Sequence, residues 1–141
     1  MLTQLKIGNE LPGIVKKIDQ EIIHRWARLS GDFNRLHVDP EYARQTLFKG
    51  TIAHGPLSLA FLNELMMACF AEKWAGRGRL LKVQFRSPIR PGDLITISGQ
   101  VEAFHQEGEE QWAECRLSVS KSDGEVAVTG LAQVPLKGAE V

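Results

Sequence analysis

A carboxylate and an imidazole stand five positions apart in one short segment of the chain, residues 30–37, which reads Ser-Gly-Asp-Phe-Asn-Arg-Leu-His. The carboxylate of Asp32 can orient water or accept a proton from it, and His37 can donate or accept a proton near neutral pH. Outside regular structure, side chains are free to converge on a ligand. These residue types at this spacing predict acid–base chemistry.

A second segment, Ala-His-Gly-Pro at residues 53–56, ends where a long apolar stretch begins. The amides and the positive dipole end at a helix N-terminus favour developing negative charge. Pro56 has no N–H, so Gly55 is the nearest donor, and a glycine lets a ligand approach its backbone closely. His54 either shapes this loop or is incidental.

Capping residues predict where the first helices begin and end. Asp19 is a good N-cap for a helix that ends at Gly31, a residue able to take positive φ. Residues 32–38 then read as a loop. Asp39, followed by proline, caps a second short helix.

The apolar stretch predicts a long helix from Pro56 to about Trp74. Apolar residues cover most of its circumference, so we expect this helix to be buried. A short extended segment, residues 13–18, precedes the first helix.

The second half of the chain alternates with period two, which is typical of half-buried antiparallel strands. Turn signals separate four such stretches: Pro-Gly-Asp at residues 91–93, the region of Gly108, and Asp-Gly at residues 123–124. In the first stretch, Leu81, Val83 and Phe85 are expected to share the core face. One buried helix followed by antiparallel strands is an α+β plan, with the sheet wrapped on the helix.

Composition excludes several classes of protein. The 141 residues predict a single domain, 1–141, with ordinary globular usage of 43% hydrophobic and 24% charged residues. Seventeen basic and seventeen acidic residues give no basic excess, so we expect no nucleic-acid partner. No segment predicts a membrane span or a signal peptide. Cys69 and Cys115 lie in apolar patterns and read as reduced core thiols of a cytoplasmic protein.

The segment from Ser30 to Ala43 resembles the signature of the (R)-specific enoyl-CoA hydratases, or hydratase-2 enzymes, of the MaoC-like dehydratase family. The Gly-Asp-x-Asn-x-x-His core is its specific part, and the resemblance covers roughly residues 20–135. It implies a hot-dog fold and a homodimer or dimer of dimers, with active sites near the subunit interface. By motif position it implies Asp32, His37 and Gly55 as catalytic residues, and Asn34 and His54 as substrate-binding residues.

The resemblance also implies a reaction. Asp32 and His37 would activate water for addition to C3 of a trans-2-enoyl thioester, while the Gly55 amide stabilises the charge on the thioester oxygen. Dehydration of a 3-hydroxyacyl thioester is the reverse. The substrate would be an acyl-CoA or an acyl-carrier-protein thioester, without cofactor or metal. Which of Asp32 and His37 is the base stays open.

Arg35 stands where the family usually has proline. Proline would stiffen the loop, whereas arginine adds a charge beside the site. One hypothesis is that Arg35 contacts a carboxylate or phosphate of an unusual acyl thioester. Arg79, Lys82, Arg86 and Arg90 are further candidates for phosphate contacts, or simply solvated residues of a strand face.

The sequence also leaves three alternatives open. A hot-dog thioesterase usually has an acidic residue on the long helix, where Glu64 is the mid-helix acid. A non-catalytic acyl-thioester-binding subunit of a hetero-oligomeric dehydratase is another alternative, although intact Asp32 and His37 argue against it. Metal catalysis would need ligands such as His24, His37, Asp39 and His54, but no recognised ligand spacing is present.

Overall fold

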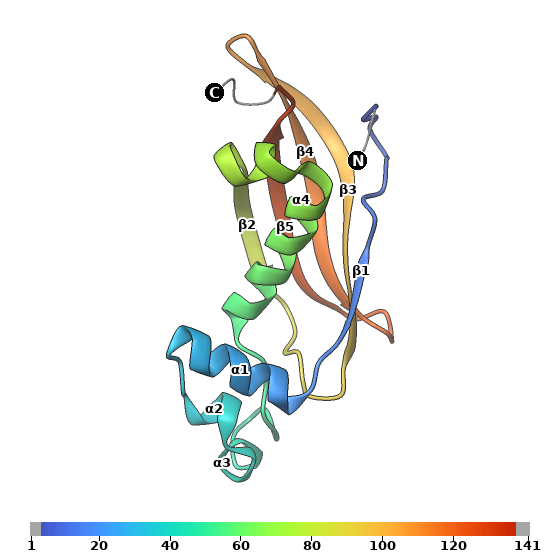
Figure 1. Ribbon diagram of the computed structural model, residues 1–141. Coiled ribbons are helices and arrows are strands. Elements are labelled where there is room, and N and C mark those ends of the chain that lie inside the picture. The colour runs from blue at the N-terminus through green and yellow to red at the C-terminus, as the bar shows by residue number, and fades with distance from the viewer. Residues whose placement is uncertain (1–3, 138–141) are drawn as a thin grey trace.

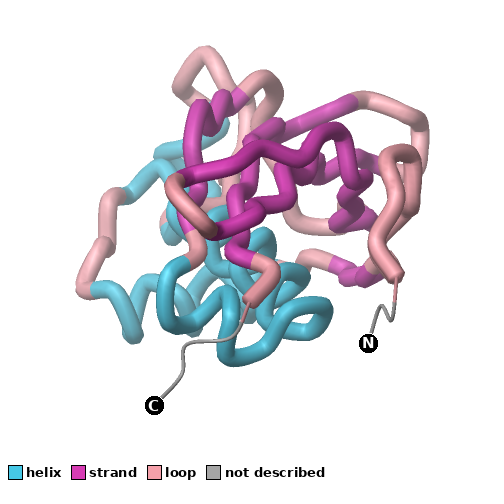
Figure 2. The backbone as a smooth tube through the Cα atoms, turned by 90° about the horizontal axis from the view of Figure 1, so that it is seen from above, coloured by secondary structure: helices cyan, strands magenta, loops and turns pink. Residues whose placement is uncertain are grey.

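The computed structural model, which describes residues 4–137, is a sheet of five antiparallel strands with the long helix α4 lying along one face (Figure 1). The strand order is β1-β3-β4-β5-β2. Viewed from above, the helices gather on one side of the strands (Figure 2). This is the α+β, hot-dog arrangement predicted from the sequence. The elements are β1 (Ile14–Lys17), α1 (Gln20–Ser30), α2 (Arg35–Val38), α3 (Pro40–Arg44), α4 (Gly55–Arg77), β2 (Arg79–Phe85), β3 (Leu94–Glu107), β4 (Glu110–Lys121) and β5 (Val126–Pro135).

Side-chain caps fix the short helices that lie at one end of the sheet. The Asp19 carboxylate accepts a hydrogen bond from the third residue of α1, and Gly31 closes that helix in the left-handed conformation, with φ of 78°. Asp39 caps α3 in the same way, with Pro40 in its first turn. These three predictions are confirmed.

The prediction of a loop over residues 32–38 is wrong in its second half, because Arg35–Val38 form the single-turn helix α2. The Asn34 side chain accepts from the Leu36 amide and so starts this turn. A turn this short carries no periodicity that a sequence could reveal.

Helix α4 buries one face, not most of its circumference as predicted. Its buried residues are Leu57, Ser58, Leu62, Leu65, Met66, Phe70 and Trp74. On the other side, Met67 is 39% exposed and Glu64 is also exposed. The helix is also longer than predicted and is kinked at Ala71, whose φ of 46° is not helical. The described chain therefore leaves a partly apolar helix face uncovered.

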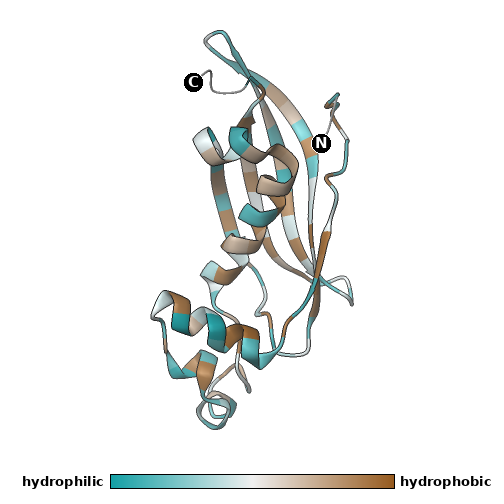
Figure 3. Cartoon of the chain, in the orientation of Figure 1, coloured by the Kyte–Doolittle hydropathy of each residue, from teal (hydrophilic) through white to brown (hydrophobic). Residues whose placement is uncertain are grey.

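The period-two alternation holds in the three central strands, where hydrophobic and hydrophilic segments follow one another along the ribbon (Figure 3). Their inward residues, with Leu62, Leu65 and Met66 of α4, form one buried cluster. The prediction for β2 is confirmed for Val83, which packs against the core, and wrong for Leu81 and Phe85, which are exposed. Leu80 packs against the core in place of Leu81, and a bulge between Leu81 and Gln84 shifts the register of the strand. A bulge inserts one extra residue and reverses the faces beyond it.

Both cysteines are free thiols: Cys115 is buried and Cys69 half-buried. Burial raises the pKa of the Cys115 thiol to about 12. Within residues 4–137, no helix has the length and apolar character needed to cross a bilayer.

Candidate active site

Asp32 is held in a tight turn directly after α1. Its amide donates to Ser30 Oγ at 3.2 Å, and its Oδ1 accepts from the Asn34 amide at 3.1 Å. Gly31 makes this turn possible by ending the helix one residue earlier. The carboxylate is exposed and can reach both solvent and a ligand.

His37 lies in α2 and is anchored through one ring nitrogen. Its Nδ1 is 2.8 Å from the carbonyl oxygen of Ile52, in the loop before α4. A carbonyl oxygen can only accept, so Nδ1 carries the hydrogen in this bond. This leaves Nε2 as the ring nitrogen available for proton transfer.

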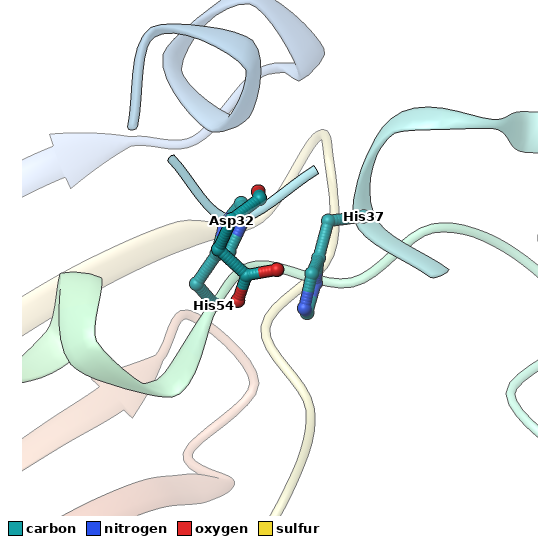
Figure 4. Close-up of side chains that lie close together, drawn as sticks. All are labelled: Asp32, His37 and His54. Atoms are coloured by element: carbon teal, nitrogen blue, oxygen red, sulfur yellow. Dashed lines mark hydrogen bonds between the residues drawn. The ribbon is translucent and has the colours of Figure 1, made fainter. Parts of the chain in front are cut away.

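Asp32, His37 and His54 converge on one point (Figure 4), where a carboxylate oxygen and one nitrogen of each ring lie within 4.8 Å of one another. Two hydrogen bonds in series span roughly 5.5 Å, so one water molecule can bridge the Asp32 carboxylate and the His37 imidazole. Asp32, in the turn after α1, and His37, in α2, can therefore hold one water molecule between them.

His54 is buried and lies directly against the ring of His37. It is 1% exposed, and its ring stacks on that of His37 with centroids 3.8 Å apart. Its Nε2 donates to the backbone carbonyl oxygen of Asp32 at 3.0 Å, which ties this loop to the turn. Burial lowers the pKa of His54, the hydrogen bond to the Asp32 carbonyl opposes this effect, and the neighbouring His37 ring adds to it. The pKa of His54 is therefore lowered overall, which favours the neutral ring.

Gly55 is the first residue of α4, and its amide has no acceptor within the described part of the chain. It lines a pocket of about 340 Å³, formed by Phe48, Ile52, Ala53, His54, Gly55, Ser58, Phe85, Arg86, Ser87, Pro88, Ile89 and Val128. Asp32 and His37 are not part of this lining. His54 connects the two, since it borders the pocket and stacks on His37.

Arg35 and Asn34 both have local partners. The Arg35 guanidinium pairs with the Asp39 carboxylate at 3.1 Å and lies over the Tyr42 ring, 4.4 Å from its centroid. These contacts account for its charge without a ligand. Asn34 Oδ1 caps α2. Of the other basic residues suggested for phosphate contacts, Arg86 lines the pocket, whereas Arg79 makes two hydrogen bonds to Glu107.

The three converging side chains were also considered as metal ligands. An imidazole binds a metal through a lone pair in its ring plane, at about 2.0–2.1 Å. The rings of His37 and His54 are stacked and only 26° from parallel, so their lone pairs run side by side rather than toward one ion. Asp39, named as a possible ligand from the sequence, caps α3 instead. The stacked geometry fits a metal poorly, and metal-free chemistry stays a prediction.

Comparisons with known proteins identify the family of the chain. The family described as "MaoC like domain" matches residues 5–122. The chain belongs to this family. It is 32% identical to an (R)-specific enoyl-CoA hydratase of Rhodospirillum rubrum, over 89% of this chain and 85% of that protein. A second enzyme of that name, from Aeromonas caviae, is 31% identical over 94% of this chain and 96% of its own.

A solved structure, the (R)-hydratase from A. caviae involved in PHA biosynthesis, superposes with a TM-score of 0.74. It is 29% identical, and the match covers 96% of this MaoC-like chain and all of that one. The hot-dog fold expected from the sequence is therefore confirmed.

Two residues near the site are not indicated by the sequence patterns. Phe85 packs on Gly55 and lines the pocket, whereas the alternation places it in the core, because a bulge such as that in β2 cannot be read from alternation. Ser58, 3% exposed, lines the pocket one turn into α4. A small polar residue within an apolar helix stripe was the signal that could have revealed it.

Proposed function

We propose that this protein is an (R)-specific enoyl-CoA hydratase, or 3-hydroxyacyl thioester dehydratase, which adds water reversibly to a trans-2-enoyl thioester. The observation that carries the proposal is the convergence of the Asp32 carboxylate and the His37 imidazole within the span of one water molecule. The full-length hydratase relatives support the same reaction.

The roles of Asp32, His37 and Gly55 follow from which of their atoms already have hydrogen-bond partners. The Asp32 carboxylate takes a proton from water as the oxygen bonds to C3, because a carboxylate is an acceptor only. His37 enters the step as the imidazolium, with one hydrogen on Nδ1 held by the Ile52 carbonyl and a second on Nε2, and it delivers the second to C2. The proton that Asp32 has taken from water then passes to His37 Nε2, which restores both residues. The Gly55 amide donates to the thioester oxygen, where negative charge builds up during the addition. The reverse sequence eliminates water from the 3-hydroxyacyl thioester.

The 340 Å³ pocket beside Gly55 would take part of the thioester. Its apolar lining suits an acyl chain or the thioester arm, with Asn34 and His54 shaping the approach. Coenzyme A and acyl carrier protein are both proposed as carriers of the acyl group. A comparison of kcat/KM for the same acyl group on each carrier decides between them.

We expect the protein to work as a homodimer or dimer of dimers. Strand β2 is at the edge of the sheet, and its Leu81 and Phe85 are exposed. An unpaired edge with apolar side chains is suited to pairing with a second copy. Light scattering on the purified protein measures this directly. Cytoplasmic location stays a prediction, supported by the two free cysteines.

The test is loss of the ultraviolet absorbance of the enoyl thioester, with crotonyl-CoA and longer or branched enoyl-CoAs. We expect Asp32→Asn and His37→Ala each to reduce kcat by at least about 100-fold, within the usual range for a general acid or base. Asp123→Asn, in the turn before β5, is the matched control and should keep full activity. Wild-type protein without activity on every enoyl-CoA and carrier-protein substrate would reject the proposal.

The environment of Glu64, the candidate catalytic acid of a thioesterase, does not favour that alternative. Glu64 is exposed on α4 and pairs with Lys16 of β1 at 3.0 Å. A thiol-trapping reagent, added to the same assay, should detect no release of free coenzyme A.

A further inference from the structure

The side chain of Gln20, at the start of α1, joins two segments that carry the site. Its Nε2 donates to the backbone carbonyl oxygen of His37 at 2.8 Å. Its Oε1 accepts from the hydroxyl of Thr51 at 2.6 Å. Thr51 is only 6% exposed and lies in the loop that leads to Gly55. One amide therefore connects α2 to the loop before α4.

The direction of both bonds is fixed by chemistry. The His37 carbonyl can only accept, so the NH2 group of Gln20 must face it. The Gln20 carbonyl oxygen can only accept, so the Thr51 hydroxyl must donate. A carboxylate in place of the amide would put two acceptors against each other at His37. An apolar side chain of similar length would leave both partners unsatisfied.

The residue next to Thr51 holds the ring of the same histidine. The Ile52 carbonyl accepts from His37 Nδ1. The side chain of His37 is thus held by Ile52, and its main chain is held through Gln20 by Thr51. These two links fix the distance between α2 and the loop, and with it the direction of His37 Nε2. A displacement of about 1 Å at a reacting group can cost roughly 100-fold in rate.

We propose that Gln20 is a positioning residue for the hydration reaction, which acts by holding His37 Nε2 on the water beside Asp32. The inference rests on the proposed function. Gln20 touches neither water nor substrate in this role, so its loss should lower kcat while leaving KM nearly unchanged. Thr51 is the second member of the same link.

The kinetic test compares three variants. Gln20→Met removes both hydrogen bonds at similar size, Gln20→Glu removes the donor to His37, and Thr51→Val removes the donor to Gln20. Both Gln20 variants also lose the 3.2 Å contact of Nε2 with His24 Nδ1, whereas Thr51→Val keeps it. We expect kcat to fall at least about tenfold in both Gln20 variants, with KM within about twofold of wild type, as for a small misplacement of a catalytic group. Thr51→Val should lower kcat by a smaller factor. The double variant Thr51→Val with Gln20→Met should have the same kcat as Gln20→Met alone, because both substitutions break the same link. Gln111→Met, at an exposed glutamine of β4, is the control for the substitution itself.

A second readout does not depend on activity. Nitrogen-15 NMR of the imidazoles reports which nitrogen of His37 carries the hydrogen. At a pH where the ring is neutral, we expect a single Nδ1–H form in the wild type, which leaves Nε2 free to take up the second proton, and a mixture of tautomers in Gln20→Met. If the wild type shows this form but hydrates no thioester, the proposed function fails while the positioning of His37 stands.

Two results would overturn the inference about Gln20. The first is a full kcat in Gln20→Met and Gln20→Glu, even if both unfold at a lower temperature, because Gln20 would then be structural only. The second is an unchanged His37 tautomer in a folded variant with reduced kcat. If a Gln20 variant does not fold, Thr51→Val alone decides, since valine matches threonine in shape.

Discussion

Gly55→Pro tests the contribution of a single N–H group. The substitution deletes the amide proposed to bind the thioester oxygen, and the backbone can accept it. Proline is favoured in the first turn of a helix, where Gly55 lies. The preceding residue, His54, has φ of −65° and ψ of 139°, the extended conformation that a residue before proline adopts.

Gly55→Ala is the matched control, because it adds a Cβ but keeps the N–H. A Cβ at this position would meet ring atoms of Phe85 at 3.2 and 3.3 Å. Ordinary carbon contacts are about 3.5–4.0 Å, so the ring must move by roughly 0.3 Å. Phe85 is 56% exposed and can make this movement at little cost. Both variants share this Cβ contact, and they differ in that proline replaces the N–H with a ring Cδ, which removes the donor and fills the place of the hydrogen.

We therefore expect kcat for crotonyl-CoA hydration to be about 100- to 1000-fold lower in Gly55→Pro than in Gly55→Ala, the usual cost of losing one such donor. Initial rates of absorbance loss at saturating substrate give kcat, and thermal unfolding verifies that both variants are folded. Equal kcat values in two folded variants would refute the assignment of the Gly55 amide as the donor.

Three further predictions concern residues around the site and the long helix. The free energy of unfolding should decrease as the pH falls below about 6.5, the ordinary histidine pKa. The reason is that His54 binds a proton more readily in the unfolded chain than in the fold, where burial lowers its pKa. Urea titrations at several pH values measure this dependence, and His54→Phe should weaken it. Arg35→Pro should leave KM unchanged for plain and acidic acyl-CoAs, because Arg35 is already paired with Asp39; a selective rise for acidic substrates would restore the ligand hypothesis. Ala71→Gly should stabilise the protein by about 1 kcal/mol, because only glycine tolerates φ of 46° with ψ of −122° at low cost, and an unchanged urea midpoint would contradict this strain.

The sequence by itself determined the fold class, the family, the two ends of α1 and the start of α3. Asp19, Gly31 and Asp39 act through bonds to residues a few positions away, so their roles can be read locally. The alternation of β3 to β5 likewise reflects one buried face of each strand. The chemistry proposed for Asp32 and His37 was also suggested by the sequence, since it depends on residue types within one short segment.

Only the tertiary structure decided how the site is assembled. The stack of His54 on His37, the bond from His37 to Ile52 and the bridge from Gln20 to Thr51 all join residues from separate segments. Local sequence patterns record the bonds within a segment, but the distance between two loops depends on how the whole chain packs. The bulge that turned Phe85 toward Gly55 has the same origin, because the pairing of β2 with β5 sets its register.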